Sequence, residues 1–400
     1  MLTRHPTRGR ENRSRSVPRC PGERRLVDSV AGRRVRSLAG YRIGGGRTRD
    51  ILVTPLLKAA LAFRLGRGVQ HLIVYVTARC PFRCRMCYVR GDPACPDLEA
   101  EELEPFIRAV GRVSMVDLGG GEPFLRDDLP RICALFPRAG AIGIPTSGWD
   151  PEAVVPKARE VLGAVGANRL YICVSIDGFQ QTNDALRAAG SFDSALRTLR
   201  SLKAIPGLRV KVNTVLCREN LGELTDLMAF IRGEDPWFHS ILLLRGDPRD
   251  PGCRLPALEE VEAVLPEVLG VQESYATAPG RLGRRIGRNY VRLLWDVSLK
   301  ILRQRRQAVP CLAGRAHLVI WPNGDVAPCE LLPPVGNIRT QSPEAILGGR
   351  PLAEAVQSIR SGACACTHNC NMVENILFNP RTYPALLGLG GPRRGGEAEQ

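Results

Sequence analysis

The sequence has no hydrophobic run long enough to cross a membrane. Its longest early apolar stretch, residues 51–65, is interrupted by Pro55 and Lys58. It also falls short of the roughly 20 residues that a membrane-spanning helix requires. The beginning of the chain lacks the apolar core of a secretory signal peptide. These absences argue against an integral membrane protein and against a secreted one, and we expect a cytoplasmic chain.

Acidic residues are scarce at the beginning of the chain. Residues 1–70 contain 17 Lys and Arg but only four Asp and Glu, so this segment carries most of the formal net charge of +16. Low hydrophobicity combined with a high net charge predicts disorder. We therefore expect residues 1–68 to form a basic, disordered leader followed by an apolar helix. We expect residues 381–400 to form a disordered tail.

Cysteine, in contrast, is abundant. Eight of the 14 cysteines fall into two groups, which are Cys80, Cys84 and Cys87, and then Cys311, Cys329, Cys364, Cys366 and Cys370. Disulfide scaffolds are small and secreted, whereas this chain is long and has no signal peptide. The grouping therefore indicates metal binding in a reducing compartment.

Short apolar segments alternate with longer amphipathic ones between residues 69 and 250. The expected strands lie at 71–77, 115–120, 141–146, 170–177, 209–216 and 240–246, with helical patterns such as 97–111, 150–164, 191–204 and 221–233 between them. Apolar strands separated by helices predict a parallel sheet that is covered on both faces. Six such units make a partial (β/α)6 TIM-like barrel or a doubly wound sheet. In either fold, functional residues gather at the carboxyl ends of the strands.

The rest of the α/β chain divides into two further parts. Residues 251–308 contain no expected strand and form a helical linker with a basic amphipathic helix at 280–307. This helix could bind RNA or a membrane surface, but a connecting helix with a solvated charged face is the simpler interpretation. Residues 309–380 are expected to form a small cysteine-rich C-terminal domain.

The first cysteine group directly follows the first expected strand, in the segment "CPFRCRMCY". The spacing of Cys80, Cys84 and Cys87 is not that of a zinc site, which pairs C-x2-C with a second pair of ligands. It also differs from ferredoxin runs, in which four cysteines supply a thiolate to every iron. Three thiolates on a cubane leave one iron open to a substrate or a cofactor.

The motif, with Tyr88 directly after it, resembles that of the radical S-adenosylmethionine (radical SAM) superfamily. This resemblance implies a [4Fe–4S] cluster on Cys80, Cys84 and Cys87, whose open iron chelates S-adenosylmethionine. It further implies reductive cleavage of that cofactor to a 5′-deoxyadenosyl radical, which abstracts hydrogen from a substrate. An electron donor such as flavodoxin or ferredoxin is implied as a partner.

The ends of later strands resemble the same family. The resemblance gives as cofactor-binding candidates Tyr88, Gly120, Gly121, Glu122, Pro123, Ser175, Asp177, Arg187 and Asn213. The alternative interpretation of Glu122 is a structural role. The glycines before it allow a close approach of the backbone. Arg187 occupies the position of a carboxylate-binding arginine in part of the family, and a guanidinium group suits that task. No catalytic acid or base is assigned.

The second cysteine group lies around an expected β-hairpin at Asn323 and Gly324. It resembles the SPASM and shorter twitch extensions of radical SAM enzymes, which carry auxiliary [4Fe–4S] clusters. A full SPASM module has more cysteines, so the five here predict one auxiliary cluster. We expect its ligands to be Cys311, Cys329, Cys366 and Cys370. Cys364 fits less well, because a one-residue gap makes it awkward for Cys364 and Cys366 to bind different irons. A four-cysteine zinc site is the alternative.

Two functional hypotheses follow from these patterns. The first is a radical SAM enzyme that modifies a peptide or oxidises a small molecule in cofactor biosynthesis, with nucleic acid not expected as a partner. The second is a non-enzymatic zinc–cysteine protein that binds RNA or a membrane through its basic segments.

Overall fold

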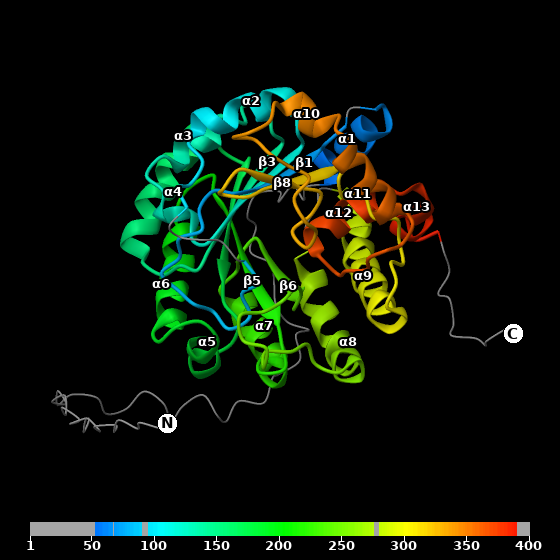
Figure 1. The fold of residues 1–400 in the computed structure, drawn as a ribbon. Helices are drawn as coiled ribbons and strands as arrows, with labels where there is room; N and C mark the ends of the chain where they lie inside the picture. Colours follow the sequence, from blue (N-terminus) through cyan, green and yellow to red (C-terminus); the bar gives the residue numbers. More distant parts are fainter. Residues whose placement is uncertain (1–52, 67, 90–94, 276–279, 390–400) are drawn as a thin grey trace, which may run out of the picture. The chain divides into compact units, whose positions relative to one another are not determined.

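The structure is a computed structural model that describes residues 53–389, except for 67, 90–94 and 276–279 (Figure 1). The expected leader therefore lies outside the described residues up to position 52. No helix in the described part of the chain is both long and apolar enough to span a bilayer.

Six parallel strands form the first part of the sheet, in the order β6-β5-β4-β3-β2-β1. They are β1 (His71–Tyr75), β2 (Met115–Gly119), β3 (Ala141–Thr146), β4 (Leu170–Ser175), β5 (Arg209–Leu216) and β6 (Phe238–Leu243). Each coincides within a few residues with a strand expected from the sequence, because a short apolar run between turn residues has few other stable conformations. This sheet and its helices have the α/β architecture expected of a partial barrel.

Helices cover the outer face of this curved sheet (Figure 1). They are α2 (Ala100–Val110), α3 (Leu129–Ala134), α4 (Pro151–Val165), α5 (Gln180–Leu186), α6 (Ser191–Lys203) and α7 (Leu224–Gly233). One large core joins them to the strands, with Phe106, Ile132 and Leu199 packed against strand residues such as Val116 and Val174. The outer face is therefore filled by side chains, and the inner face is left for polar groups.

The C-terminal domain continues the same sheet. Its strand β7 (His317–Ile320) pairs in parallel with β1, and β8 (Asp325–Ala327) and β9 (Gly336–Asn337) follow in antiparallel order. The turn between β7 and β8 contains Gly324 with φ of +94°, a conformation that glycine adopts at little cost. The hairpin agrees with the sequence prediction, but its pairing with β1 was not predicted.

The remaining α-helices are α1 (Val53–Arg64), α8 (Leu258–Ser274), α9 (Gly280–Gln304), α10 (Pro343–Leu347), α11 (Arg350–Arg360), α12 (Asn369–Leu377) and α13 (Tyr383–Leu386). Of these, α8 packs against α7, β6 and α9, whereas α1, α9, α12 and α13 share one core. The disordered tail was predicted to begin at residue 381, which is too early. The first residues of that segment include α13, which packs against α9 through Leu386 and Tyr290. The apolar moments of such short helices are too small to be recognised in a sequence.

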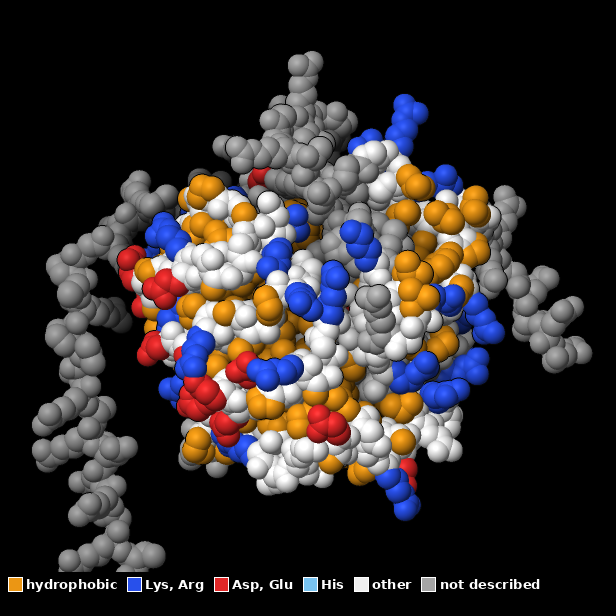
Figure 2. All heavy atoms as spheres, turned by 90° about the horizontal axis from the view of Figure 1, so that it is seen from above, with side chains coloured by type: hydrophobic (Ala, Val, Ile, Leu, Met, Phe, Trp, Pro, Cys, Tyr) orange, Lys and Arg blue, Asp and Glu red, His pale blue; other side chains and the backbone are white. Residues whose placement is uncertain are grey.

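The basic helix α9 is a connecting helix in the structure. Val291, Trp295 and Leu299 pack on one side in a core shared with α8 and β6. Exposed arginines on the other side include Arg292 and Arg303, which pair with Glu273 and Glu262 of α8. On the face drawn in Figure 2, Lys and Arg side chains are interspersed with apolar and acidic ones. This arrangement favours the solvated-face interpretation of α9.

A buried network joins the barrel to the C-terminal domain on the inner face of the sheet. The ring of His71 on β1 contacts Glu374 of α12 at 2.9 Å and Asp117 of β2 at 3.1 Å. Tyr171 of β4 donates to the other oxygen of Asp117 at 2.7 Å. Burial alone would lower the pKa of His71, but Glu374 and Asp117 outweigh it and raise this pKa to about 10. His71 is therefore charged in the folded protein at neutral pH.

This network predicts a pH-dependent contribution to stability. A histidine whose pKa is raised on folding stabilises the protein fully below its unfolded pKa, near 6.5, and this contribution is lost as pH rises towards about 10. We expect the difference in melting temperature between wild type and His71→Gln to shrink by about 2 °C or more from pH 6.5 to pH 10. Thermal unfolding followed by circular dichroism measures it.

His239→Gln is the matched control. His239 is also a buried histidine, but burial lowers its pKa to about 3, so it stays neutral throughout that range. Its variant should differ from wild type by a constant amount between pH 6.5 and pH 10. An equally constant difference for His71→Gln would show that His71 is not charged in the fold.

Candidate active site at the carboxyl ends of the strands

The first three cysteines lie in the loop that follows β1. Cys80 is exposed and Cys84 and Cys87 are partly buried, and none of the three forms a disulfide. The loop is fixed by backbone hydrogen bonds, since the Arg85 N–H donates to Leu186 at 2.9 Å and the Arg249 N–H donates to Cys87 at 2.9 Å. Burial raises the pKa of the Cys80 thiol to about 11. Coordination to iron would hold this side chain as the thiolate, the form in which cysteine binds a metal.

Two glycines after β2 let the backbone lie directly against this loop. A Cβ atom at Gly120 would lie 2.5 Å from the carbonyl oxygen of Thr77, and one at Gly121 would lie 2.1 Å from that of Arg79. The Gly121 N–H donates to Thr77 at 2.8 Å. Only glycine fits such an approach, so these two residues set the position of the cysteine loop.

Glu122 is buried and its carboxylate is used within the protein. One oxygen accepts hydrogen bonds from the Ser147 N–H at 2.8 Å and the Ser147 hydroxyl at 2.7 Å. The other accepts from the Phe124 N–H at 3.3 Å. Pro123 is buried behind it at the start of a short 3-10 turn. These contacts connect the ends of β2 and β3 and support the structural alternative for Glu122.

Asp177 and Arg187 form a buried ion pair beside the cysteine loop. Arg187 Nε lies 2.6 Å from Asp177 Oδ2, and the other oxygen of Asp177 accepts from the Val215 N–H at 2.7 Å. Arg187 Nη1 lies 3.8 Å from the sulfur of Cys84. Asp177 thus orients Arg187, and the guanidinium group is the member of the pair that reaches the loop.

Ser175 and Asn213 are neighbours across the β4–β5 pair, where their Cα atoms are in register. Both are half-buried and lie at the carboxyl end of the sheet. The structure thus brings these two candidates to the same end of the barrel as Asp177. Their contact with a cofactor remains a prediction.

Tyr88 points into a buried polar cluster on the inner face. Its hydroxyl lies 3.1 Å from that of Tyr75 and accepts from Arg245 Nη2 at 2.9 Å. Tyr75 also donates to Glu330, and His368 Nε2 lies 2.7 Å from Glu330 Oε2. Since Tyr88 follows Cys87 and Glu330 follows Cys329, the cluster extends from the first cysteine group to the second.

Sequence reasoning missed two members of this cluster, Tyr75 and Arg245. The sequence contains one signal for Tyr75. Alternate residues of a strand point to the same face, so Tyr75 lies on the same face of β1 as His71, four residues earlier. A strand with polar groups on one face and apolar groups on the other is expected to line a polar interior. Arg245 lies in a loop beyond β6, where no periodicity marks it.

The structure groups the second set of cysteines differently from the prediction. Cys311, Cys329 and Cys364 pack in one cluster, and the thiol of Cys366 interacts electrostatically with that of Cys364. Cys370 lies instead against the inner face of the barrel, where it packs with Ile73, Tyr75, Val319 and Ala327. The groups that shift its pKa, after burial, are Asp117, Glu330, Arg245 and Glu374.

The objection to Cys364 has a physical answer. Residues 363–368 form neither helix nor strand in the structure. Where such a segment is extended, side chains two residues apart point to the same side and are about 6.6 Å apart along the chain. That spacing suits two thiolates on different irons, so a one-residue gap does not by itself exclude Cys364. The grouping therefore favours Cys364 over Cys370 as the partner of the other three.

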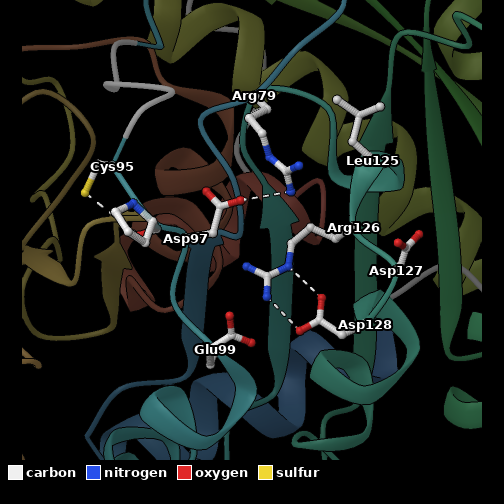
Figure 3. Close-up of a pocket in the computed structure, with 9 residues that line it drawn as sticks. Arg79, Cys95, Asp97, Glu99, Leu125, Arg126, Asp127 and Asp128 are labelled. Atoms are coloured by element: carbon white, nitrogen blue, oxygen red, sulfur yellow. Dashed lines mark hydrogen bonds and ion pairs between the residues drawn. The ribbon is translucent and has the colours of Figure 1, made fainter.

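A polar surface pocket of about 450 Å³ lies beside the first cysteine loop (Figure 3). Its charged groups pair with one another, since Arg79 lies 3.3 Å from Asp97 and Arg126 lies 2.6 Å from Asp128. Arg126 also donates to the carbonyl oxygen of Val76 at 2.8 Å. These pairs hold the backbone on both sides of the loop.

Comparison with known proteins places both halves of the chain. The family model of the radical SAM superfamily matches residues 74–231, and that of the SPASM iron-sulfur cluster-binding domain matches residues 311–371. A pre-heme d1 synthase of Dinoroseobacter shibae is 32% identical over 196 residues, which is 46% of this chain and 46% of that protein. The mycofactocin maturase MftC of Mycobacterium tuberculosis is 28% identical over 180 residues, 44% of this chain and 45% of the relative. The alignments thus cover less than half of each relative.

The crystal structure of Streptococcus suis SuiB bound to its precursor peptide SuiA has a TM-score of 0.54 to this chain. It is 15% identical and covers 75% of this chain and 70% of SuiB. This likeness shows the shared fold. It agrees with the two family matches and with the positions of the two cysteine groups, and the non-enzymatic zinc-protein hypothesis is therefore wrong. The chain belongs to the radical SAM superfamily and is an enzyme with a SPASM C-terminal domain.

Proposed function

We propose that this enzyme reductively cleaves S-adenosylmethionine and abstracts a hydrogen atom from a substrate at the inner face of the barrel. The observation that carries the proposal is the loop of Cys80, Cys84 and Cys87, fixed against Gly120 and Gly121 at the carboxyl ends of the strands. When bound there, a [4Fe–4S] cluster and S-adenosylmethionine supply a 5′-deoxyadenosyl radical.

The chain's own residues bind and orient this cofactor. Cys80, Cys84 and Cys87 would hold the cluster through their three thiolates, and three protein ligands would leave a place on it for S-adenosylmethionine. Arg187, fixed by Asp177, provides a cation for a carboxylate next to Cys84. Ser175 and Asn213 line the sheet beyond it and are proposed to contact the ribose.

A peptide is the first substrate candidate. Solved neighbours of the same fold have been crystallised with peptides, including SuiB with SuiA. The buried cluster of Tyr75, Tyr88 and Arg245 offers hydroxyl groups and a cation to a substrate that enters the barrel. A carboxylated tetrapyrrole is the second candidate, since the 32% identical relative is a pre-heme d1 synthase. We place the reaction in the cytoplasm, with flavodoxin or ferredoxin as electron donor, because reduced thiolates persist there.

We further propose that Cys311, Cys329, Cys364 and Cys366 hold one auxiliary [4Fe–4S] cluster. Four thiolates close such a cluster, which favours electron transfer over direct substrate binding. Glu330 and His368, which lie next to this group, connect it through hydrogen bonds and ion pairs to Tyr75. Cys370 faces the barrel interior, and we do not assign it as a ligand of either cluster.

The replacement of Cys80, Cys84 and Cys87 together by Ala tests the first cluster. We expect about eight irons per chain in the anaerobically reconstituted wild type and about four in the variant, because one of two four-iron clusters is lost. Dithionite-driven formation of 5′-deoxyadenosine should disappear. Iron analysis and chromatography measure both, and Cys133→Ala, at a buried position of helix α3, is the control that should change neither. Retained cleavage in the triple variant would contradict the proposal.

Single variants of Cys364 and Cys370 test the auxiliary ligand set. We expect Cys364→Ala to lose about two to four irons per chain and to change the Mössbauer spectrum, because the auxiliary cluster loses one of its four thiolates. Cys370→Ala should keep the wild-type iron content and its Mössbauer spectrum. The reverse result would restore Cys370 as the fourth ligand.

The rate of 5′-deoxyadenosine formation distinguishes the two substrate candidates. Cleavage of S-adenosylmethionine in the absence of a substrate gives a background rate of 5′-deoxyadenosine formation. A true substrate should raise this rate by about tenfold or more. A library of short peptides and sirohaem, an iron tetrapyrrole with eight carboxylates, are the two probes, with mass spectrometry to detect product. Stimulation by the tetrapyrrole alone would remove the peptide proposal.

A further inference from the structure

Two cysteines outside both groups lie together with a carboxylate. Cys217 directly follows β5, Glu219 comes two residues later, and Cys253 lies in the loop after β6. Their two sulfur atoms and one carboxylate oxygen all lie within 4.8 Å of one another. The sulfur of Cys253 is 3.9 Å from Glu219 Oε2. Both thiols are buried, whereas Glu219 is partly exposed.

The spacing of this trio suits a single metal ion. Ligands of one ion share a small coordination sphere, with Zn–S near 2.3 Å and Zn–O near 2.0 Å. Thiolates on different irons of a cubane are held further apart, because the cluster lies between them. Among the residues that the structure describes, this is the one group of three Cys, His or acidic side chains that comes so close together. It is thus distinct in kind from the two cluster-binding groups.

The surrounding chain holds the trio in place. The Cys217 N–H donates to the Asn220 side chain at 3.0 Å, and Asn220 in turn donates to Asp177 at 2.7 Å. The Cys253 N–H donates to the carbonyl of Asp250 at 2.9 Å. Arg85 occupies one oxygen of Glu219 at 3.1 Å, which leaves Oε2 facing the sulfur of Cys253. An arginine that orients a ligating carboxylate is typical of the surroundings of a metal site.

We propose that Cys217, Glu219 and Cys253 bind one Zn²⁺ ion. Two thiolates with a carboxylate favour zinc over Mg²⁺ or Ca²⁺, which prefer oxygen ligands alone. Three protein ligands leave a fourth tetrahedral position for water. Binding releases one proton from each thiol, so the three ligands and the ion carry a net charge of −1 beside Arg85, which pairs with both Glu219 and Asp250.

The ion would connect two loops of the active-site rim. Cys217 and Glu219 belong to the loop after β5, and Cys253 to the loop after β6. The Asp250 N–H donates to the carbonyl of Arg85 at 2.9 Å, so the β6 loop is also bonded to the first cysteine loop. Cys253 and Arg245 both line a pocket of about 340 Å³ formed by this loop. Bound zinc would therefore fix the wall of that pocket relative to the first cysteine group.

Zinc analysis of the full-length, anaerobically reconstituted enzyme tests the proposal. After incubation with one equivalent of ZnCl2 and desalting, we expect about one zinc per chain and an unchanged iron content. The zinc K-edge absorption spectrum should show two sulfur neighbours near 2.3 Å and lighter neighbours near 2.0 Å. The Cys217→Ser/Cys253→Ser double variant should retain no zinc. Glu219→Gln keeps the size of this partly exposed side chain and should weaken zinc binding by about tenfold or more.

Matched variants separate this site from the cluster-binding cysteines. Cys133→Ser removes a buried, isolated thiol and should keep the zinc. The Cys80/Cys84/Cys87→Ala variant should also keep it. Equal zinc in wild type and in the double variant would overturn the proposal. So would an absence of zinc in the wild type, or a Cys217–Cys253 disulfide found by mass spectrometry in the anaerobic protein.

Discussion

Strand β1 is hydrogen-bonded on both sides, and this constraint fixes the geometry of the two cysteine groups. On one side it pairs with β2, and on the other with β7 of the C-terminal domain. The first cysteine loop leaves from the end of β1, while Cys311 and Cys329 lie on either side of the β7–β8 hairpin. A rigid ladder thus connects them. A change in the distance between the groups would require breaking parallel strand pairs that are buried on both faces.

The polar inner face follows from the same arrangement. Packing of α12 against the sheet buries His71 and Glu374 and partly buries Asp117 and Glu330, and buried charges are costly unless they are paired. Each of these four side chains has an oppositely charged or hydrogen-bonding partner from another element. The network therefore aligns α12 and its neighbouring cysteines with the barrel. It also lines the space between the two cofactor groups with side chains that can exchange hydrogen bonds with a substrate.

Much of the fold could be predicted from the sequence, because it depends on residues that are close together in the chain. Strands such as "AIGIPT" are short, apolar and bounded by turn residues, and the spacing of Cys80, Cys84 and Cys87 is fixed by the covalent chain. What could not be predicted depends on contacts between distant residues. The pairing of β7 with β1, the burial of His71 against Glu374 and the approach of Cys253 to Cys217 each join segments far apart in the sequence. The choice between Cys364 and Cys370 is of the same kind, because it depends on the direction in which α12 enters the barrel.

One cluster is proposed to have an open iron for S-adenosylmethionine, and the auxiliary cluster to be closed by four thiolates. Electron–nuclear double resonance of the reduced enzyme, with S-adenosylmethionine labelled with ¹⁵N at its amino group, distinguishes the two clusters. We expect a ¹⁵N coupling in the wild type and none in the Cys80/Cys84/Cys87→Ala variant, which keeps only the auxiliary cluster. A coupling that persists in that variant, or no coupling in the wild type, would show that the open iron does not lie on the first cysteine group.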